Sequence, residues 1–249
     1  RVERGRTKRY AYLGTGNFNE RTSRLYSDQA LLTCNAMMTR EVGEVFEHLK
    51  DRSHRPRLQL LLMAPLTLRD QLEALVDKEI EHALSGREAA ITLKLNSLED
   101  RAMISKLYDA SRAGVKVRLI IRGICCLVPG IPGTSENIEA ISIVDRFLEH
   151  SRTYVFQNNG KPLIYLSSAD LMGRNLDHRI EVAFPVLDPA LRQEMTELME
   201  LQWSDRVKAR TIDAVQANKY RRPLRNQRPV RAQEAIYALV KKRSASGSR

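Results

Sequence analysis

The sequence predicts an α/β fold, and three observations point to this class. Between residues 67 and 122 the apolar residues read as helix, strand, helix and strand, which is the pattern of a parallel sheet covered by helices. The last of these strands, 115–121, is rich in valine, isoleucine and leucine, as a strand buried on both faces requires. The chain has 249 residues, 43% of them hydrophobic, which suits one large or two modest domains with proper cores.

The elements expected up to residue 121 follow from the spacing of apolar residues and from turn residues. Strands are expected where short apolar runs are bounded by polar or turn residues, at 10–13, 29–34, 58–63, 89–95 and 115–121. Helices are expected where apolar residues recur at helical spacing, at 40–50, 67–84 and 97–112. Ser97 is the expected cap of the third helix, with Asp100 three residues on, and Gly114 is expected to end it.

Beyond residue 121 a loop rich in Gly and Pro occupies 122–133, at the end of a strand where open α/β sheets bind ligands. Residues 152–157 and 163–166 are expected to pair as a hairpin, because Asn159-Gly160 lies between them. The other expected strands are 141–144 and 180–186. The other expected helical segments are 145–149, 188–203 with Pro189 at its start, 207–217 and 232–242, while 221–231 and 244–249 are expected to be irregular.

The charge of the chain is unevenly distributed. The net charge is +11, and residues 206–249 alone hold 13 Lys and Arg against 2 Asp and Glu. Such a block attracts a polyanion such as nucleic acid, anionic lipid or polyphosphate, and the alternative is a solvated tail. No apolar run is long enough for a membrane span, and the first residues lack the apolar core of a signal peptide.

The chain contains three cysteines, Cys34, Cys125 and Cys126. An odd number with two adjacent residues is neither a disulfide framework nor a zinc-binding spacing, so a reducing cytoplasm is expected. The chain begins at Arg1 in the middle of a pattern, and we expect it to be a piece of a longer protein.

Two stretches separated by about the length of a domain repeat the same order of residues. Tyr12 and Tyr165 each begin a Tyr-Leu pair that is followed by small residues, polar residues with an arginine, and then an acid at the start of a strand. With one gap, that acid is Asp28 in the first stretch and Glu181 in the second. A repeat at this spacing predicts two related halves that face each other with a site between them.

These two loops, with His150 before a strand and Arg122 after one, resemble the phospholipase D-like phosphoryl-transfer enzymes. Five stretches in order narrow the resemblance to the polyphosphate kinases built from two phospholipase D-like domains, and the similarity covers residues 9–242. The five stretches are 14–28, 120–125, 142–150, 167–181 and 204–210.

The resemblance implies an α/β fold with a phospholipase D-like mixed sheet flanked by helices. Residues 1–62 would be the C-terminal part of a first catalytic domain, and residues 63–249 a complete second catalytic domain with a basic C-terminal tail. The implied reaction is reversible transfer of the terminal phosphate of ATP to inorganic polyphosphate through a phosphohistidine. In the family the nucleophilic His lies in a His-x-Lys stretch upstream of the segment matching residues 10–17, so we expect this chain to be inactive alone.

The resemblance also implies the partners and the location. ATP or ADP and inorganic polyphosphate are the expected ligands, and a homo-oligomer is expected, whereas nucleic acid is not. Mg²⁺ is the expected cofactor, with its ligands and the adenine site upstream of Arg1 and no metal ligand in this chain. The expected location is the cytoplasm, with the inner face of the membrane as a peripheral site.

Nine residues match positions with a role in the family. His150 matches the second catalytic His, and imidazole can transfer a proton near neutral pH. Arginines suit phosphate because their planar fork binds two oxygens at once. ATP or phosphate is expected to contact Tyr26, Arg122, His150 and Arg179. The pocket lining, or the groups that orient these residues, are expected to be Asn17, Asp28, Ser168, Arg174 and Glu181.

One position departs from the wider superfamily, in which Lys stands two residues after the His. This chain has Arg152 there, and Arg does not replace Lys one for one. The departure counts against simple phosphodiesterase chemistry. Two alternatives to a polyphosphate kinase stay open, namely a phospholipase D-like phosphodiesterase and a non-catalytic module that binds polyanions or nucleic acid through the basic block.

Overall fold

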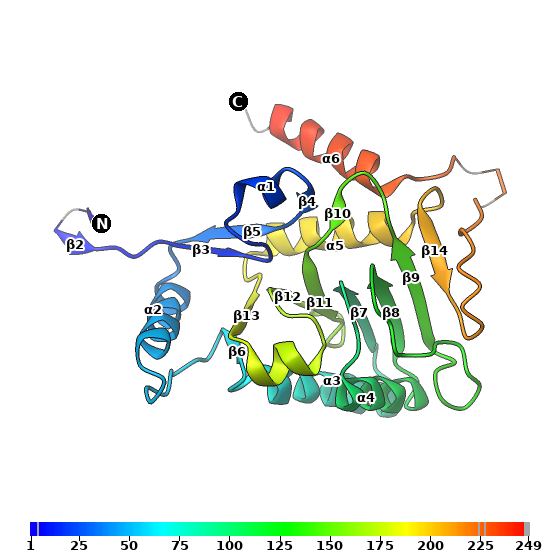
Figure 1. Cartoon of the computed structure of the whole chain (residues 1–249), viewed down its shortest axis with the longest axis horizontal. Helices are drawn as coiled ribbons and strands as arrows, with labels where there is room; N and C mark the ends of the chain where they lie inside the picture. The colour runs from blue at the N-terminus through cyan, green and yellow to red at the C-terminus, as the bar shows by residue number, and fades with distance from the viewer. Residues whose placement is uncertain (4, 224, 227, 247–249) are drawn as a thin grey trace.

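An eight-stranded mixed sheet forms the centre of the molecule (Figure 1). The structure is a computed structural model that describes residues 1–3, 5–223, 225–226 and 228–246. The strand order is β14-β9-β8-β7-β11-β12-β13-β6. The strands are β6 (Leu62–Ala64), β7 (Ala90–Leu95), β8 (Lys116–Ile121), β9 (Ile138–Ile143), β11 (Arg152–Phe156), β12 (Leu163–Ser167), β13 (Glu181–Pro185) and β14 (Ala209–Ile212). β7, β8 and β9 are mutually parallel and the other neighbours are antiparallel, which confirms the predicted mixed sheet.

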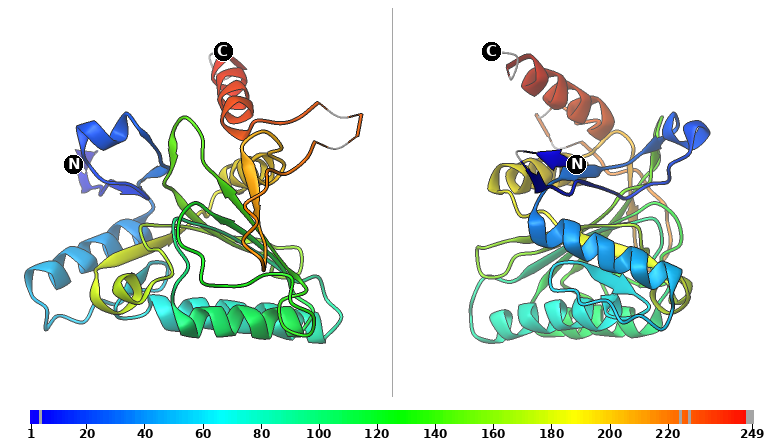
Figure 2. Two further views of the ribbon diagram at one scale, coloured as in Figure 1. Left: turned by 45° about the vertical axis from the view of Figure 1, so that its right-hand side comes forward. Right: turned by 90° about the vertical axis from the view of Figure 1, so that its left-hand side faces the viewer.

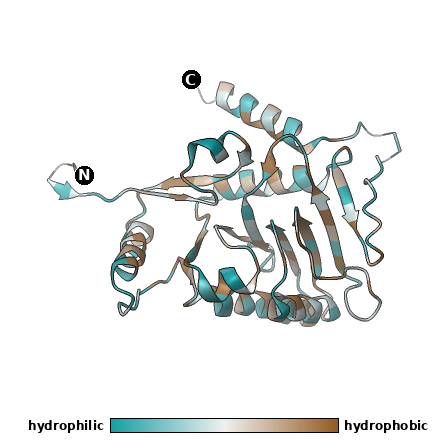
Figure 3. Cartoon of the chain, viewed as in Figure 1, coloured by the Kyte–Doolittle hydropathy of each residue, from teal (hydrophilic) through white to brown (hydrophobic). Residues whose placement is uncertain are grey.

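Helices cover both faces of this sheet. α3 (Leu68–Leu84) and α4 (Arg101–Arg112) lie on one face, and α5 (Pro189–Trp203) lies on the other (Figures 1 and 2). Because successive strand residues point to opposite faces, Leu119 of β8 joins the core cluster with α3 and α4, while Ile120 packs in the cluster with Trp203 of α5. Figure 3 shows hydrophobic residues concentrated in the central strands.

The N-terminal region lies beside β10, and its helix α2 packs near the edge of the sheet that carries β6 (Figure 1). Its elements are β1 (Val2–Glu3), β2 (Arg6–Thr7), β3 (Ala11–Gly14), α1 (Glu20–Ser23), β4 (Tyr26–Ser27), β5 (Ala30–Thr33) and α2 (Ala36–Lys50). β3 and β5 form an antiparallel ribbon, and β4 pairs in parallel with β10 (Leu148–Glu149). The predicted domain boundary after residue 62 falls inside β6, and the division into two domains stays a prediction.

Two predicted helical segments are strands. Residues 145–149 form no helical turn, because Leu148 N donates to Leu25 O at 2.8 Å and the segment pairs with β4. Residues 209–212 form β14 instead of a helix over 207–217. The carboxylate of Asp205 is fully buried and accepts the N–H groups of residues 207, 208 and 209 at 2.8, 2.6 and 2.9 Å, which turns the chain alongside β9.

Several predicted boundaries also differ. α2 begins at Ala36 and not at residue 40, and β9 begins at Ile138 and not at residue 141. Ser97 does not cap α4, because Leu98 pairs with Cys125 and Leu171 and keeps this segment extended, so the helix begins after Asp100, whose side chain accepts from Met103 N. The strand expected over 58–63 starts only at Leu62. The preceding N–H groups of residues 59, 60 and 61 bind the buried carboxylate of Glu41 of α2 instead of another strand.

The basic C-terminal block is part of the fold. β14 extends the sheet, and α6 (Ala232–Ser246) packs beside α5 above the sheet (Figure 1). Residues 244–246, predicted to be irregular, continue α6, and the rest of that prediction, 247–249, lies outside the described residues. The segment 221–231 is irregular as predicted where the structure describes it. Among the described residues no helix is long and apolar enough to cross a membrane.

Candidate functional site

The polar residues that the sequence singled out lie at the edge of the sheet that is formed by the ends of its strands, which is different from the lateral edge at β6. β7 and β8 end at this edge, and the antiparallel strands β11 and β13 begin there. Arg122 and Glu181 therefore lie at the same edge but four strands apart, which corresponds to about 19 Å. The predicted residues form two groups along this edge, one around His150 and one around Glu181.

His150 of the first group is held by a carboxylate from the N-terminal region. Its Nδ1 lies 2.9 and 3.0 Å from the two carboxylate oxygens of Asp28. Because an ionised carboxylate only accepts hydrogen bonds, Nδ1 carries the proton of this contact. Thr15 Oγ1 donates to Asp28 Oδ1 at 2.8 Å and holds the carboxylate from its other side. The Nε2 atom of His150 is thereby the ring nitrogen that does not face Asp28.

The carboxyl group of Asp28 is kept ionised by its neighbours. Burial opposes ionisation, but the hydrogen bonds from His150 and Thr15 and the charges of His150 and Arg152 outweigh it and hold the pKa of Asp28 below its usual value. The backbone of Gly16 makes room for this carboxylate, because a Cβ atom there would lie 2.1 Å from Asp28 Oδ2. Asp28 is therefore a fixed negative charge at the imidazole of His150.

Tyr26 joins the same group through the pairing of β4 with β10. The Tyr26 ring lies 4.7 Å from the His150 ring, centroid to centroid, at an angle of 43°. His150 N and Ser151 N donate to Ser27 O at 3.2 and 3.0 Å, so the main chains of the two segments are also joined. The first repeated stretch therefore contributes Tyr26 and Asp28 to the surroundings of His150, and the idea that two related halves face each other stays a prediction.

Arg122 reaches the site from the end of β8. Its Nε donates to Asn96 Oδ1 at 2.9 Å and to Glu149 O at 3.2 Å, which fixes the side chain. Asn96 Nδ2 in turn donates to His150 O at 3.2 Å. The two terminal nitrogens of Arg122 have no hydrogen-bond partner among the described residues, so its guanidinium group can bind an anion.

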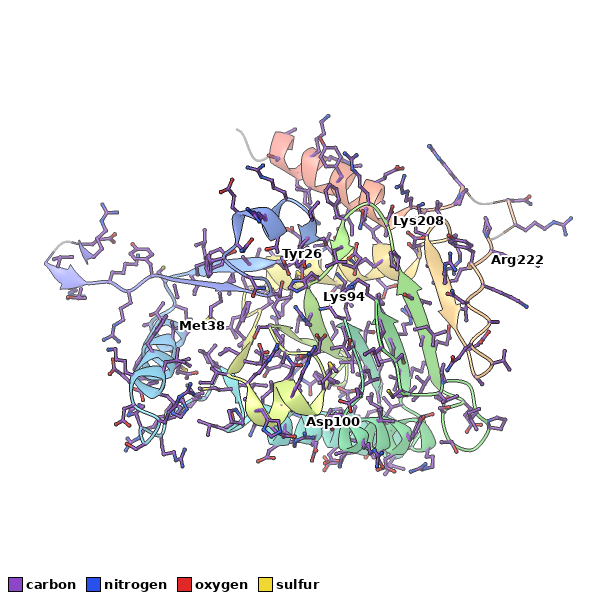
Figure 4. All side chains as sticks on the ribbon, viewed as in Figure 1. Tyr26, Met38, Lys94, Asp100, Lys208 and Arg222 are labelled. Atoms are coloured by element: carbon purple, nitrogen blue, oxygen red, sulfur yellow. The ribbon has the colours of Figure 1, made fainter. Side chains whose placement is uncertain are left out.

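A buried ion pair supports the segment that carries His150. Lys94 Nζ donates to Glu149 Oε2 at 2.7 Å and to Ser151 Oγ at 2.6 Å, with Lys94 and Glu149 only 2% and 3% exposed. Lys94 and Tyr26, both labelled in Figure 4, contact the β10 segment from different elements. Sequence reasoning missed Lys94, because a lysine alternating with Ile91 and Leu93 in a strand has the pattern of an exposed residue.

The second group surrounds Glu181. Its carboxylate, which is only 9% exposed, accepts from Ser168 Oγ and from Asn175 Nδ2, the latter at 2.7 Å. Asn175 belongs to η1 (Arg174–His178), a π-helical turn that the sequence did not predict. Arg174, Arg179 and Asn17 are exposed, and no side-chain hydrogen bond of theirs is formed with the described residues. No contact joins these three to His150, and their roles stay predictions.

The described residues form no cluster of side chains that would hold a metal ion by themselves. Within the described ranges, no group of three or more His, Cys, Asp and Glu side chains is placed to hold a metal ion. Asp28 is occupied by His150 and Thr15, and Glu149 is occupied by Lys94. The chemistry available to the described residues is proton transfer at His150 and stabilisation of negative charge at Arg122.

Comparisons with known proteins agree on one family. Residues 61–233 match the family model described as polyphosphate kinase C-terminal domain 2, and residues 1–55 match polyphosphate kinase C-terminal domain 1. The polyphosphate kinase of Yersinia pestis is 50% identical over 241 residues, and that of Escherichia coli strain K12 is 49% identical over 241 residues. Each alignment covers 97% of this chain but 35% of the relative, so the chain spans about a third of their length.

Solved structures give the same result. The crystal structure of polyphosphate kinase from Porphyromonas gingivalis superposes with a TM-score of 0.91 at 44% identity, covering 95% of this chain and 36% of that one. Phosphatidylserine synthase from Haemophilus influenzae superposes with a TM-score of 0.56 at 12% identity, covering 95% of this chain and 67% of that one. The second likeness concerns the fold alone.

Proposed function

The chain belongs to the polyphosphate kinase family, and on this premise we propose that the protein containing it transfers the terminal phosphate of ATP reversibly to inorganic polyphosphate. The observation that carries the proposal is the group around His150. It combines an imidazole oriented by Asp28, an arginine whose terminal nitrogens have no partner in the described part of the chain, and an aromatic ring. Phosphoryl transfer depends mainly on such positioning and charge stabilisation.

In the proposed reaction a histidine upstream of residue 1 attacks the terminal phosphorus of ATP. A nitrogen–phosphorus bond forms, the bond from that phosphorus to the bridging oxygen breaks, and ADP leaves. The terminal oxygen of a polyphosphate chain then attacks the phosphohistidine and releases the histidine. Arg122 would hold oxygens of the transferred phosphate with its free fork. His150 would transfer a proton at Nε2, because Asp28 fixes Nδ1.

The other parts of the proposal concern components outside this chain. Mg²⁺ would be held by residues upstream and would neutralise phosphate charge. Tyr26 would contact the nucleotide, and Arg179 at the far end of the sheet edge would contact the polyphosphate chain. We also propose the homo-oligomeric state, the cytoplasmic location and the division into phospholipase D-like domains at residues 62 and 63. This chain alone would be inactive, because its nucleophile lies elsewhere.

His150→Ala in the full-length protein tests the proposal. We expect transfer of labelled phosphate from ATP to polyphosphate to fall by about 10²–10⁴-fold, the range of general acid–base catalysis. His54→Ala is the matched control. His54 Nε2 also lies 3.0 Å from a carboxylate, that of Glu44, but on the loop after α2. Its activity should stay within about twofold of wild type.

The result has three readings that can be told apart. Loss of activity in a folded His150→Ala protein, with an active His54→Ala protein, supports the proposal. Near-wild-type turnover in folded His150→Ala protein removes His150 from the reaction. A wild-type protein that hydrolyses a phosphodiester but does not transfer phosphate from ATP would instead favour the phospholipase D-like phosphodiesterase.

A further inference from the structure

We propose that Arg152 is a positioning residue that holds the imidazole of His150, and that it does not bind the transferred phosphate. The proposal rests on the function proposed for His150. Arg152 stands two residues after His150, where the wider superfamily has a lysine, so a phosphate-binding role would be the obvious expectation. The contacts of its guanidinium group point to a different role.

Each nitrogen of the Arg152 guanidinium group already has a partner. Nε lies 3.3 Å from Asp170 Oδ1 and Nη2 lies 2.9 Å from Asp170 Oδ2, which is a two-point ion pair. Nη1 donates to Thr15 O at 3.4 Å and lies against the ring of His150. Arg152 is only 8% exposed and Asp170 is 4% exposed. Of the five N–H groups of the guanidinium group, only one of the two on Nη2 has no partner among the described residues. Burial and the remaining contacts therefore leave little of Arg152 for a phosphate, whereas two-point binding of a phosphate would displace one of these contacts.

The position of Nη1 shows how Arg152 meets His150. Nη1 lies 3.4 Å from Nδ1 and 3.2 Å from Nε2 of the ring. An atom this near to both nitrogens cannot lie in the ring plane, because it would overlap the carbon between them. The guanidinium nitrogen therefore rests on the face of the imidazole, and the in-plane direction of Nε2 stays open to a reactant. Asp28 holds the edge of the ring while Arg152 holds a face.

Asp170 provides the anchor for this arrangement. Its Oδ1 also accepts from Asn96 N at 2.8 Å and from Ser97 N at 3.1 Å, so the carboxylate is fixed to the main chain at the end of β7. Through Asp170 and Thr15 O, Arg152 connects the central sheet to the N-terminal region. A rigid planar fork can pair with a carboxylate and place its other terminal nitrogen against a ring at once, whereas the point charge of lysine cannot.

Arg122 shows the opposite arrangement at the same site. Only its Nε is bound within the protein, to Asn96 Oδ1 and Glu149 O, and both terminal nitrogens lack a partner among the described residues. The two arginines therefore have different roles. Arg122 can offer both terminal nitrogens to phosphate, whereas Arg152 is bound to Asp170 and Thr15 O and lies against the imidazole.

Arg152→Lys and Arg122→Lys in the full-length protein separate these roles. For Arg152→Lys we expect kcat to fall by about 100-fold with the KM for ATP within about threefold of wild type, because a misplaced ring slows the chemical step. Lysine at position 122 keeps a charge for phosphate but loses the fork, so the KM for ATP should rise more than kcat falls. If Arg152→Lys keeps most of kcat and raises KM instead, Arg152 is a phosphate ligand and the proposal is wrong.

Arg69→Lys is the matched control for loss of a partly buried arginine–aspartate pair, in which Arg69 also contacts Asp177. Arg69 makes a two-point pair with Asp100 at 2.8 Å, away from His150. This variant should lower Tm with unchanged kcat below the transition. A matching loss of kcat in Arg69→Lys would mean that the effect at Arg152 is general destabilisation. Asp170→Asn should reproduce the Arg152→Lys defect, and the double variant should be no slower than either single one.

A measurement on the wild-type protein covers the case in which the variants do not fold. In a crystal structure of the full-length protein with a non-hydrolysable ATP analogue, or with inorganic phosphate, Arg152 should keep its pair with Asp170, and Arg122 should contact phosphate oxygens. A phosphate oxygen within hydrogen-bonding distance of Arg152 would overturn the proposal. If the wild-type protein does not transfer phosphate from ATP, the proposed function fails, whereas the structure still decides the role of Arg152.

Discussion

Gly16→Ala tests whether the contact between Asp28 and His150 controls activity. An ideal Cβ atom at residue 16 would lie 2.1 Å from Oδ2 and 2.4 Å from Cγ of Asp28. Ordinary van der Waals contact begins at 3.4 Å, so the carboxylate and the new methyl group must separate by the difference, about 1.3 Å. The side chain of Asp28 has to move, because it is the nearest group and the loop backbone is tied to Gln29.

The size of the effect follows from this movement. The Nδ1···Oδ1 distance to His150 is now 2.9 Å, and a shift of this size takes it beyond hydrogen-bonding range. A misplacement of about 1 Å at a reacting group lowers the rate by about 100-fold. The protein should stay folded, because only the hydrogen bonds of Asp28 are lost. The free energy of unfolding should fall by about 1 kcal/mol.

The assay is transfer of labelled phosphate from ATP to polyphosphate by the full-length protein, with Tm measured on the same sample. Gly43→Ala is the matched control, because a Cβ atom there has no neighbour within 4 Å and the residue lies inside α2. Alanine should stabilise that helix by about 0.5–1 kcal/mol with activity unchanged. The reasoning is refuted if Gly16→Ala retains more than half of wild-type turnover, or if Gly43→Ala loses as much.

Three further outcomes follow from single contacts. Asp205→Ala leaves the N–H groups of residues 207–209 and of Ala232 without their acceptor. The free energy of unfolding, measured with denaturant, should fall by at least about 3 kcal/mol. A fall of less than about 1 kcal/mol would contradict the role given to Asp205. Because folding lowers the pKa of Asp28, its ionised carboxylate stabilises the protein above pH ~4, and this contribution is lost as pH falls. Asp28→Asn should therefore flatten the decline of Tm between about pH 5 and pH 3, and an unchanged slope would count against it. Gln233 Nε2 donates to Phe147 O at 2.8 Å and to Glu149 Oε1 at 2.7 Å, and so holds the segment before His150. Gln233→Ala should therefore lower turnover by about 10-fold. Gln193 is exposed, and Gln193→Ala should leave turnover unchanged.

The central elements of the fold were predictable because the sequence features that indicate them lie within each segment. α3, β7, α4 and β8 each show a clear period of apolar residues, and short turns with Gly86 and Gly114 in left-handed conformations separate them. The same is true of α5, where Asp188 caps the helix and Pro189 stands at its first position. These segments specify their own conformation before any tertiary contact is made.

The predictions that were wrong concern segments whose conformation depends on distant parts of the chain. β14 and β10 form because of strands far away in sequence, β9 in one case and β4 in the other. Neither segment shows an alternation of apolar residues that would identify it as a strand. Short polar segments take whichever conformation gives their N–H groups an acceptor, and that acceptor is visible only in the folded molecule.

The candidate site could be predicted as a set of residues but not as a set of contacts. The repeat placed Asp28 and Glu181 at equivalent positions as orienting acids, and the structure shows Asp28 on His150 and Glu181 on Ser168 and Asn175. Nothing in the sequence indicated which acid meets which partner. Lys94 was missed because the alternation of residues in its strand predicts an exposed position for it, although it is almost fully buried.

The geometry of His150 depends on residues that lie more than 100 positions earlier in the chain. Asp28 holds its ring, Ser27 O binds its main-chain N–H, and Thr15 O binds the arginine that rests on its face. Without the N-terminal region, His150 would keep its place at this edge and its contact with Arg152 but would lose the hydrogen bond at Nδ1. The regions that match the two family models are therefore not independent in function, because the imidazole of one region is oriented by the side chains of the other.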